Sequence, residues 1–362
     1  MSNIKIKKNF ITPVLFICLT AGIGLFALFL LPRYPIISDS ADYDNAALTL
    51  LQEKKFLPSG GVLYPPGYLF FLAIIYAVFG HNYDAVYIIQ FLLLGGIGTI
   101  VYFIGKNRLQ FSDKQAVIVS IVTIGWPYFI LYPMLLMSEI LFIFLFLLFV
   151  YYFLDSKIIS GLFLGLATLT RPVILFLPFW LIFFAFLFAQ RISIKKQLIL
   201  FLIIIFPWII FTYINSGKII PVASNLPIVL EKAYKTLGYE EEFQNSAPAE
   251  INLQTIVVSK LKNIYLFWNP GAGGYQAEAV TEKYAQARYL FLLYKTAFFI
   301  ILGLAFISLK FWKTKEIFFL WTIILYFWLL HTILFPFPRY TLPVIPLVII
   351  LAIFTIKRVY EH

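Results

Sequence analysis

Long apolar stretches separated by short polar segments recur along most of this 362-residue chain. A helix that crosses the hydrocarbon core of a bilayer needs roughly 20 mostly apolar residues. We predict about ten transmembrane helices from this pattern, at residues 10–32, 85–105, 115–133, 139–154, 158–170, 172–189, 198–214, 289–309, 317–335 and 341–356. The predicted fold class is therefore an all-α polytopic membrane protein.

The composition agrees with this pattern, because 62% of the residues are hydrophobic and the mean hydropathy is +0.90. Membrane lipid is the expected solvent of such a chain. The net charge of +11 does not predict nucleic-acid binding, because the basic residues form short clusters between apolar runs instead of one surface.

The basic clusters indicate the orientation of the chain. With both termini cytoplasmic, every second connection is basic, as the positive-inside rule requires; these connections hold Lys106, Arg108 and Lys114; Lys157; Arg191, Lys195 and Lys196; Lys310, Lys313 and Lys315; and Lys357 with Arg358. The pattern depends on a hairpin at Arg171-Pro172, since one uninterrupted helix there would reverse every later connection.

Three parts follow from the predicted spans: an N-terminal transmembrane catalytic module at 1–214 with an outer loop at 33–84, a small extracytoplasmic cap at 215–288, and C-terminal transmembrane helices at 289–362. In the loop, the apolar run 69–79 is too short to cross the membrane. It predicts a short helix in the membrane interface, with a tilted or re-entrant helix as the alternative. The cap contains three glutamates at 240–242 and a glycine-rich loop at 270–274, which lacks the spacing of a nucleotide-binding fingerprint.

An acidic cluster follows the first span, in a chain of which only 12% of residues are charged. Asp39 is a candidate general base, or a metal-supported carboxylate, that would take a proton from an attacking hydroxyl. The alternative is that it caps the helix that follows. Asp42 and Asp44 are interpreted as capping or solvated residues.

Other ionisable residues near the membrane are predicted on the same outer side. Glu139 would line the cavity or help to bind a cation, or it is simply the acidic first turn of a helix. Arg171 and Arg339 would bind a phosphate through paired hydrogen bonds, or extend to lipid headgroups. His331 is interpreted as a packed residue.

A divalent metal ion is one further option. Asp39, Asp42 and Glu139 offer the oxygen ligands that a hard cation prefers. Their spacing does not require a metal, and no cofactor is predicted with certainty.

Several short motifs follow one another along the chain and are predicted on the same outer side of the membrane. They are Asp39-x-x-x-Tyr43, Tyr64-Pro65-Pro66-Gly67-Tyr68, Gly80 before the second span, Glu139, Leu169-Thr170-Arg171-Pro172, and Pro338-Arg339-Tyr340-Thr341-Leu342-Pro343. In these motifs the chain resembles the integral-membrane GT-C glycosyltransferases, and most closely the protein mannosyltransferase and aminoarabinose transferase group with its bacterial relatives.

The resemblance implies an enzyme that moves a sugar from a polyprenyl-phosphate carrier to an acceptor on the extracytoplasmic face. It implies that Asp39 is the catalytic base, accompanied by Tyr43, and that Glu139 is the second acidic residue of the reaction centre. Arg171, Arg339 and Tyr340 would bind the donor phosphate, and Asp42 and Tyr64 would support the site.

The chain departs from the family pattern at two of these positions. Many relatives have an acidic residue where this chain has Ser40, and relatives near the aminoarabinose transferases have a basic residue where Tyr64 stands. The acceptor, a lipid, glycan or protein, stays open.

Two other functions remain as alternatives. A transporter or flippase of lipid-linked sugars predicts ionisable or helix-breaking residues at mid-membrane and repeated halves, and the sequence offers little of either. A noncatalytic membrane assembly protein with the same fold is compatible with Ser40.

Overall fold

The protein is described here by a computed structural model of residues 2–30, 33–56, 64–188, 194–224, 226–234, 252–269 and 285–360. These ranges contain α-helices and short 3-10 helices and no strand, so the all-α prediction is confirmed. The glutamates 240–242 and the glycine-rich loop 270–274 lie outside them. The chain divides into two compact units, Met1–Ser224 and Asn225–His362, which we describe separately.

The first unit carries the acidic cluster. Its helices in chain order are α1 (Ser2–Leu30), α2 (Asp39–Glu53), α3 (Pro66–Phe79), α4 (Tyr83–Arg108), α5 (Asp113–Ile124), α6 (Pro127–Leu131), η1 (Tyr132–Met134), α7 (Glu139–Leu154), α8 (Ser160–Thr170), η2 (Pro172–Ile174), α9 (Leu177–Leu187) and α10 (Lys195–Ser216).

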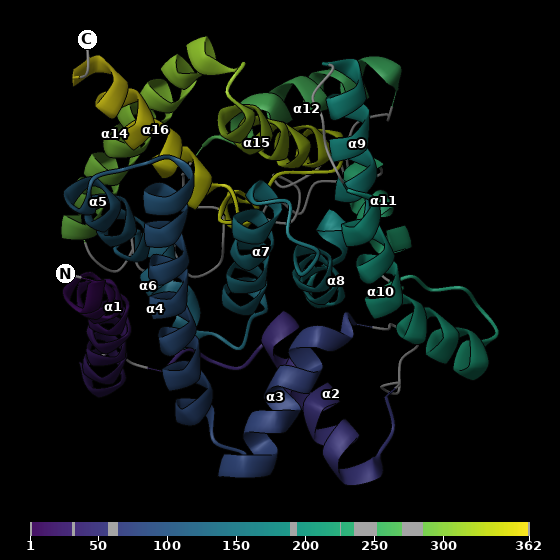
Figure 1. The fold of residues 1–362 in the computed structure, drawn as a ribbon. Helices are drawn as coiled ribbons and strands as arrows, with labels where there is room; N and C mark the ends of the chain where they lie inside the picture. The colour runs from purple at the N-terminus through teal and green to yellow at the C-terminus, as the bar shows by residue number, and fades with distance from the viewer. Residues whose placement is uncertain are drawn as a thin grey trace. The chain divides into compact units, whose positions relative to one another are not determined.

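Helix α4 is the centre of this unit, since α1, α5 and α7 all pack against it. Helix α7 also packs against α8, and α8 against α10. The shorter helices α2 and α3 lie side by side at one end of the unit (Figure 1). Their shared core is aromatic and aliphatic, and its buried residues include Tyr43, Tyr68, Leu72, Tyr87 and Leu136.

The two ends of α4 and α7 differ in charge. At the C-terminal ends, Arg108 of α4 is 3.1 Å from Asp155 after α7, and Lys157 is 3.7 Å from the same carboxylate. At the other end, Gln90 of α4 donates hydrogen bonds to the carbonyls of Pro133 and Leu135, just before α7. The two helices therefore run parallel, with the basic connections at one end and the acidic cluster at the other.

Five helices in the described residues are long and apolar enough to cross a membrane; they are Ile11–Leu30, Tyr83–Arg108, Lys195–Ser216, Leu292–Phe311 and Lys315–Ile333. A sixth span arises if Asp113–Ile124 and Pro127–Met134, which meet at 64°, are counted together. The count of about ten transmembrane helices therefore stays a prediction.

The expected single helix at 115–133 is wrong in one respect, because the chain breaks between α5 and α6. Gly125 ends α5, and Trp126 has extended backbone angles of −64° and 130°. The ring of Pro127 disfavours a helical residue before it, so an apolar run that looks continuous is interrupted here.

The helix break that the predicted hairpin at Arg171 requires is present, and the hairpin itself stays a prediction. Helix α8 ends at Thr170, Arg171 is extended, and Pro172 begins a 3-10 turn. The short helix expected at 69–79 is also present as α3, which starts at Pro66 and ends at Phe79, just before Gly80. Its place in the membrane interface stays a prediction.

The second unit contains α11 (Leu226–Tyr234), α12 (Leu253–Leu266), α14 (Ala285–Ile307), η4 (Ser308–Phe311), α15 (Lys315–Ile333), η5 (Pro338–Thr341) and α16 (Ile345–Tyr360). Helix α14 packs against α16, and α12 against α15. The Lys260 ammonium of α12 donates to the carbonyls of Ala233 and Leu334, at the ends of α11 and α15. Burial lowers the pKa of Lys260. The described helices of the predicted cap thus pack with the C-terminal helices.

Candidate functional site

The site begins with the first turn of α2. Ser38 stands at the N-cap position with φ 53° and ψ −135°, and its side chain makes no capping bond. Such a conformation is costly for a residue with a side chain and persists only where the surroundings enforce it. Asp39 follows as the first residue of α2 and is partly exposed. The prediction that Asp39 caps the helix is therefore not what the structure has.

Tyr43 lies one turn after Asp39, on the same face of α2. It is buried, and its hydroxyl is hydrogen-bonded to the side chain of Ser138. Burial is the largest effect on the pKa of Tyr43 and raises it. The charge of Arg171 and the Ser138 hydrogen bond lower this pKa, and the charges of Glu139 and Asp39 raise it. The net effect is a raised pKa. These residues therefore form one electrostatic cluster, in which Tyr43 stays a protonated phenol at neutral pH.

Glu139 and Arg171 form an ion pair at the ends of α7 and α8. Arg171 Nη1 lies 2.5 Å from Glu139 Oε1, with side-chain exposures of 19% and 2%. Arg171 also lies 3.4 Å from the Ser138 hydroxyl, as a donor. Within the described residues, neither Glu139 oxygen has a donor in hydrogen-bonding geometry, so the contact with Arg171 is mainly electrostatic.

The predicted supporting residues Asp42 and Tyr64 contact each other. The Tyr64 hydroxyl donates to Asp42 Oδ2 at 2.5 Å, and the Tyr64 ring lies 5.4 Å from the Tyr43 ring, between centroids. Burial raises the pKa of Tyr64, and Asp42 raises it further. Asp42 itself is exposed, as predicted. Because Tyr43 and Tyr64 both keep their protons at neutral pH, they can donate hydrogen bonds.

A glycine follows the paired prolines because position 67 packs directly against the end of α8. A Cβ atom at this position would lie 2.6 Å from Thr170 Oγ1 and 2.9 Å from the Thr170 backbone nitrogen. The start of α3 thus touches the last residue of α8, next to Arg171. This close approach fixes the outer loop over the end of α8 that carries the arginine.

Replacing Gly67 with alanine should destabilise the protein by about 1–3 kcal/mol, because the added methyl group overpacks a contact with backbone. Gly22→Ala in α1 is the matched control, since a Cβ there would meet nothing within 4 Å. Thermal unfolding in detergent measures both variants. Equal unfolding temperatures for the two would contradict the proposed close contact.

One buried polar residue that was not among the predicted site residues, Gln90, fixes the start of α7. Gln90 donates to the two carbonyls before α7 and accepts a 3.2 Å hydrogen bond from the Tyr68 hydroxyl. A broken helix leaves backbone carbonyls that must find donors inside a membrane protein. One glutamine in an apolar run was the available signal.

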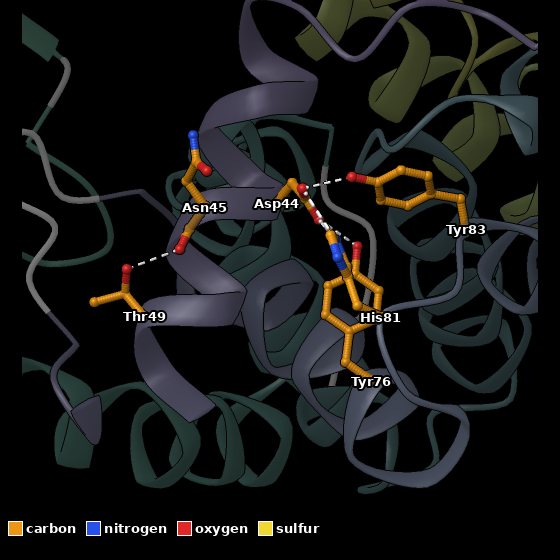
Figure 2. A network of polar contacts seen from close by, with 6 residues as sticks. All are labelled: Asp44, Asn45, Thr49, Tyr76, His81 and Tyr83. Carbon is orange, nitrogen blue, oxygen red and sulfur yellow. Dashed lines mark hydrogen bonds and ion pairs between the residues drawn. The ribbon is translucent and has the colours of Figure 1, made fainter. Parts of the chain in front are cut away.

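The structure corrects the interpretation of Asp44. Instead of being a cap or solvated, Asp44 is only 6% exposed. Its carboxylate accepts hydrogen bonds from Tyr76 at 2.6 Å and Tyr83 at 2.8 Å, and His81 Nε2 lies 2.9 Å from Oδ1 (Figure 2). No sequence pattern indicates these contacts, because the partners lie 32 to 39 residues from Asp44.

Arg339 and Tyr340 belong to η5 in the second unit, so their predicted part in phosphate binding stays a prediction. The Arg339 guanidinium lies 5.5 Å from the centre of the Tyr340 ring, and this ring stacks on His331 at 4.4 Å. His331 is buried and also stacks on Phe267. The prediction that His331 is a packed residue agrees with these contacts.

The carboxylates proposed as metal ligands are distributed along two helices. In the part of the chain that the structure describes, no group of three or more His, Cys, Asp or Glu residues is close enough to hold a metal ion. Asp39, Asp42 and Glu139 are therefore not assembled as a three-ligand site in the described residues.

Comparison with solved structures finds the same fold in ArnT from Cupriavidus metallidurans, which has the GT-C fold. With ArnT bound to undecaprenyl phosphate the TM-score is 0.65 at 13% identity, over 95% of this chain and 60% of that one. With apo ArnT the TM-score is 0.62 at 13% identity, over 95% and 59%. Neither protein-family models nor curated proteins gave a match. The predicted GT-C fold is confirmed, and this chain spans about 60% of the length of the structures that it matches.

Proposed function

We propose that this protein transfers a sugar from a polyprenyl-phosphate carrier to an acceptor hydroxyl at the extracytoplasmic face of the membrane. One observation carries the proposal: α2 brings Tyr43, one turn after Asp39, to Ser138 beside the buried Glu139–Arg171 ion pair at the start of α7. The GT-C fold and the undecaprenyl phosphate bound to the similar ArnT structure support a lipid-linked donor.

The proposed reaction uses Asp39 as the general base. Its carboxylate takes the proton of the acceptor hydroxyl while the hydroxyl oxygen attacks the anomeric carbon of the sugar. The bond between that carbon and the phosphate oxygen breaks, and the polyprenyl phosphate leaves with the electron pair. Positioning the hydroxyl opposite the leaving group supplies much of the rate enhancement.

Arg171 is the proposed partner of the leaving phosphate. A guanidinium stabilises negative charge that develops on a phosphate oxygen and binds it through fixed N–H groups. Glu139 holds the arginine at the end of α8, and Tyr43 and Ser138 complete the polar wall around it. The predicted phosphate binding by Arg339 and Tyr340 stays a separate proposal, which concerns the second unit alone.

The charge distribution supports an extracytoplasmic site. Arg108 and Lys157 lie at the C-terminal ends of α4 and α7, whereas Glu139 lies at the opposite end of α7. By the positive-inside rule, the basic end faces the cytoplasm. We propose on this basis that the Glu139 end of α7 faces away from the cytoplasm; the cytoplasmic location of both termini stays a prediction.

The test is sugar transfer by the purified protein in lipid vesicles, from radiolabelled polyprenyl-phosphate sugars to a membrane extract. Transfer from one donor would establish the reaction and identify the sugar. Movement of the donor between leaflets without transfer would instead support a flippase. Binding of undecaprenyl phosphate with neither activity would favour a noncatalytic protein.

A further inference from the structure

Asp44 lies at a junction that the proposed reaction does not use. It is buried on α2, and its hydrogen-bonding partners come from the end of α3, the following turn and the start of α4 (Figure 2). An ionised carboxylate in such a place is stable only when donors surround it. The side chains of Tyr76, His81 and Tyr83 supply these donors, so both oxygens of Asp44 have hydrogen-bonding partners.

The turn between α3 and α4 is shaped to present His81. Gly80 ends α3 with a φ of 71°, which favours glycine, and Asn82 caps α4 by accepting from the Asp84 and Ala85 amides. The His81 ring is then held between two tyrosine rings, 4.9 Å from Tyr76 and 4.8 Å from Tyr83, each nearly perpendicular to it. These contacts restrict the imidazole to one orientation, with Nε2 toward Asp44.

Asp44 and Tyr43 are neighbours in sequence and project in directions about 100° apart around α2. Tyr43 contacts the ends of α7 and α8 through Ser138 and the charges of Glu139 and Arg171. Asp44 contacts α3 and α4 on the adjacent face. Two fixed contacts on different faces define both the rotation of a helix about its axis and its height along that axis.

We propose that Asp44, with Tyr76, His81 and Tyr83, is a positioning device that holds α2 so that Asp39 faces the acceptor hydroxyl. The inference rests on the function proposed above, since it assigns a role relative to that base. Asp44 does not touch the reacting atoms. A small rotation of α2 would displace Asp39 while leaving the Glu139–Arg171 pair at the ends of α7 and α8 unchanged.

The experiment compares Asp44→Asn with the unaltered protein. Misplacement of a catalytic group lowers turnover by about 10- to 100-fold, so kcat should fall in this range. The KM for the sugar donor and the affinity for undecaprenyl phosphate should stay unchanged. Hydrogen exchange of the peptide covering residues 39–53 should become faster, with no change in the middle of α4.

Milder variants keep the test meaningful where Asp44→Asn does not fold. Tyr83→Phe removes a single donor, and His81→Gln should retain more activity than His81→Ala because glutamine keeps an N–H donor. Thr49→Ala is the matched control on the same helix, since the Thr49 hydroxyl donates to the Asn45 carbonyl of α2 itself (Figure 2). It should leave kcat and exchange unchanged.

The outcomes separate this inference from the proposed function. If Asp39→Asn is inactive but Asp44→Asn and the milder variants keep full kcat and normal exchange, the positioning role is wrong and the reaction stands. If Asp44→Asn raises KM alone, Asp44 belongs to substrate binding, which also overturns the inference. Full transfer by Asp39→Asn would instead refute Asp39 as the base, and no transfer by the unaltered protein would overturn the proposed function.

Discussion

Replacing Asp39 with asparagine should lower sugar transfer by about 10²- to 10⁴-fold, the usual contribution of a general base. Asparagine keeps the size and shape of the side chain and loses only its basicity. The first turn of α2 and its contact with Ser138 through Tyr43 should therefore persist. The measurement is the initial rate of transfer in lipid vesicles, with the unfolding temperature taken in parallel.

Asp42→Asn is the matched control for this experiment. It makes the same chemical change three residues along the same helix, at an exposed carboxylate that accepts a hydrogen bond from Tyr64. Its effect should be about tenfold or less, because one hydrogen bond is weakened and no base is lost. Equal losses in the two variants would argue that the carboxylates act as a pair. Normal transfer by Asp39→Asn would refute the assignment of the base.

The sequence predicted the parts of this site that depend on position along the membrane helices. The apolar run after Glu139 and the proline after Arg171 place the two residues at helix ends, and counting spans places those ends on one side. The ion pair between them was not predicted, because a shared side of the membrane leaves the distance between two residues open.

The failed predictions have a common physical cause, since each depends on tertiary contacts or on a local backbone break within a uniform pattern. Asp44 lies in a polar stretch, and only the turn at Gly80–Asn82 brings His81 to it. The break at Trp126 lies within a continuous apolar run, where hydrophobicity alone predicts one helix. Gln90 is a single polar residue whose partners are backbone carbonyls, which a side-chain pattern does not reveal.

Replacing Arg171 with alanine should have two separable effects. It leaves the Glu139 carboxylate buried without its partner, which costs about 3–5 kcal/mol of stability for a pair of this kind. It also removes the proposed phosphate ligand, so the affinity for undecaprenyl phosphate should fall by about 10- to 100-fold. Thermal unfolding measures the first effect, and binding of undecaprenyl phosphate in detergent measures the second.

The double variant Arg171→Ala with Glu139→Gln distinguishes a structural arginine from a phosphate-binding one. Glutamine cannot carry the buried charge, so most of the lost stability should return. Binding of undecaprenyl phosphate should stay weak, because no guanidinium is present to meet the phosphate. If binding recovers together with stability, Arg171 serves only to neutralise Glu139, and the donor phosphate must be held by other residues.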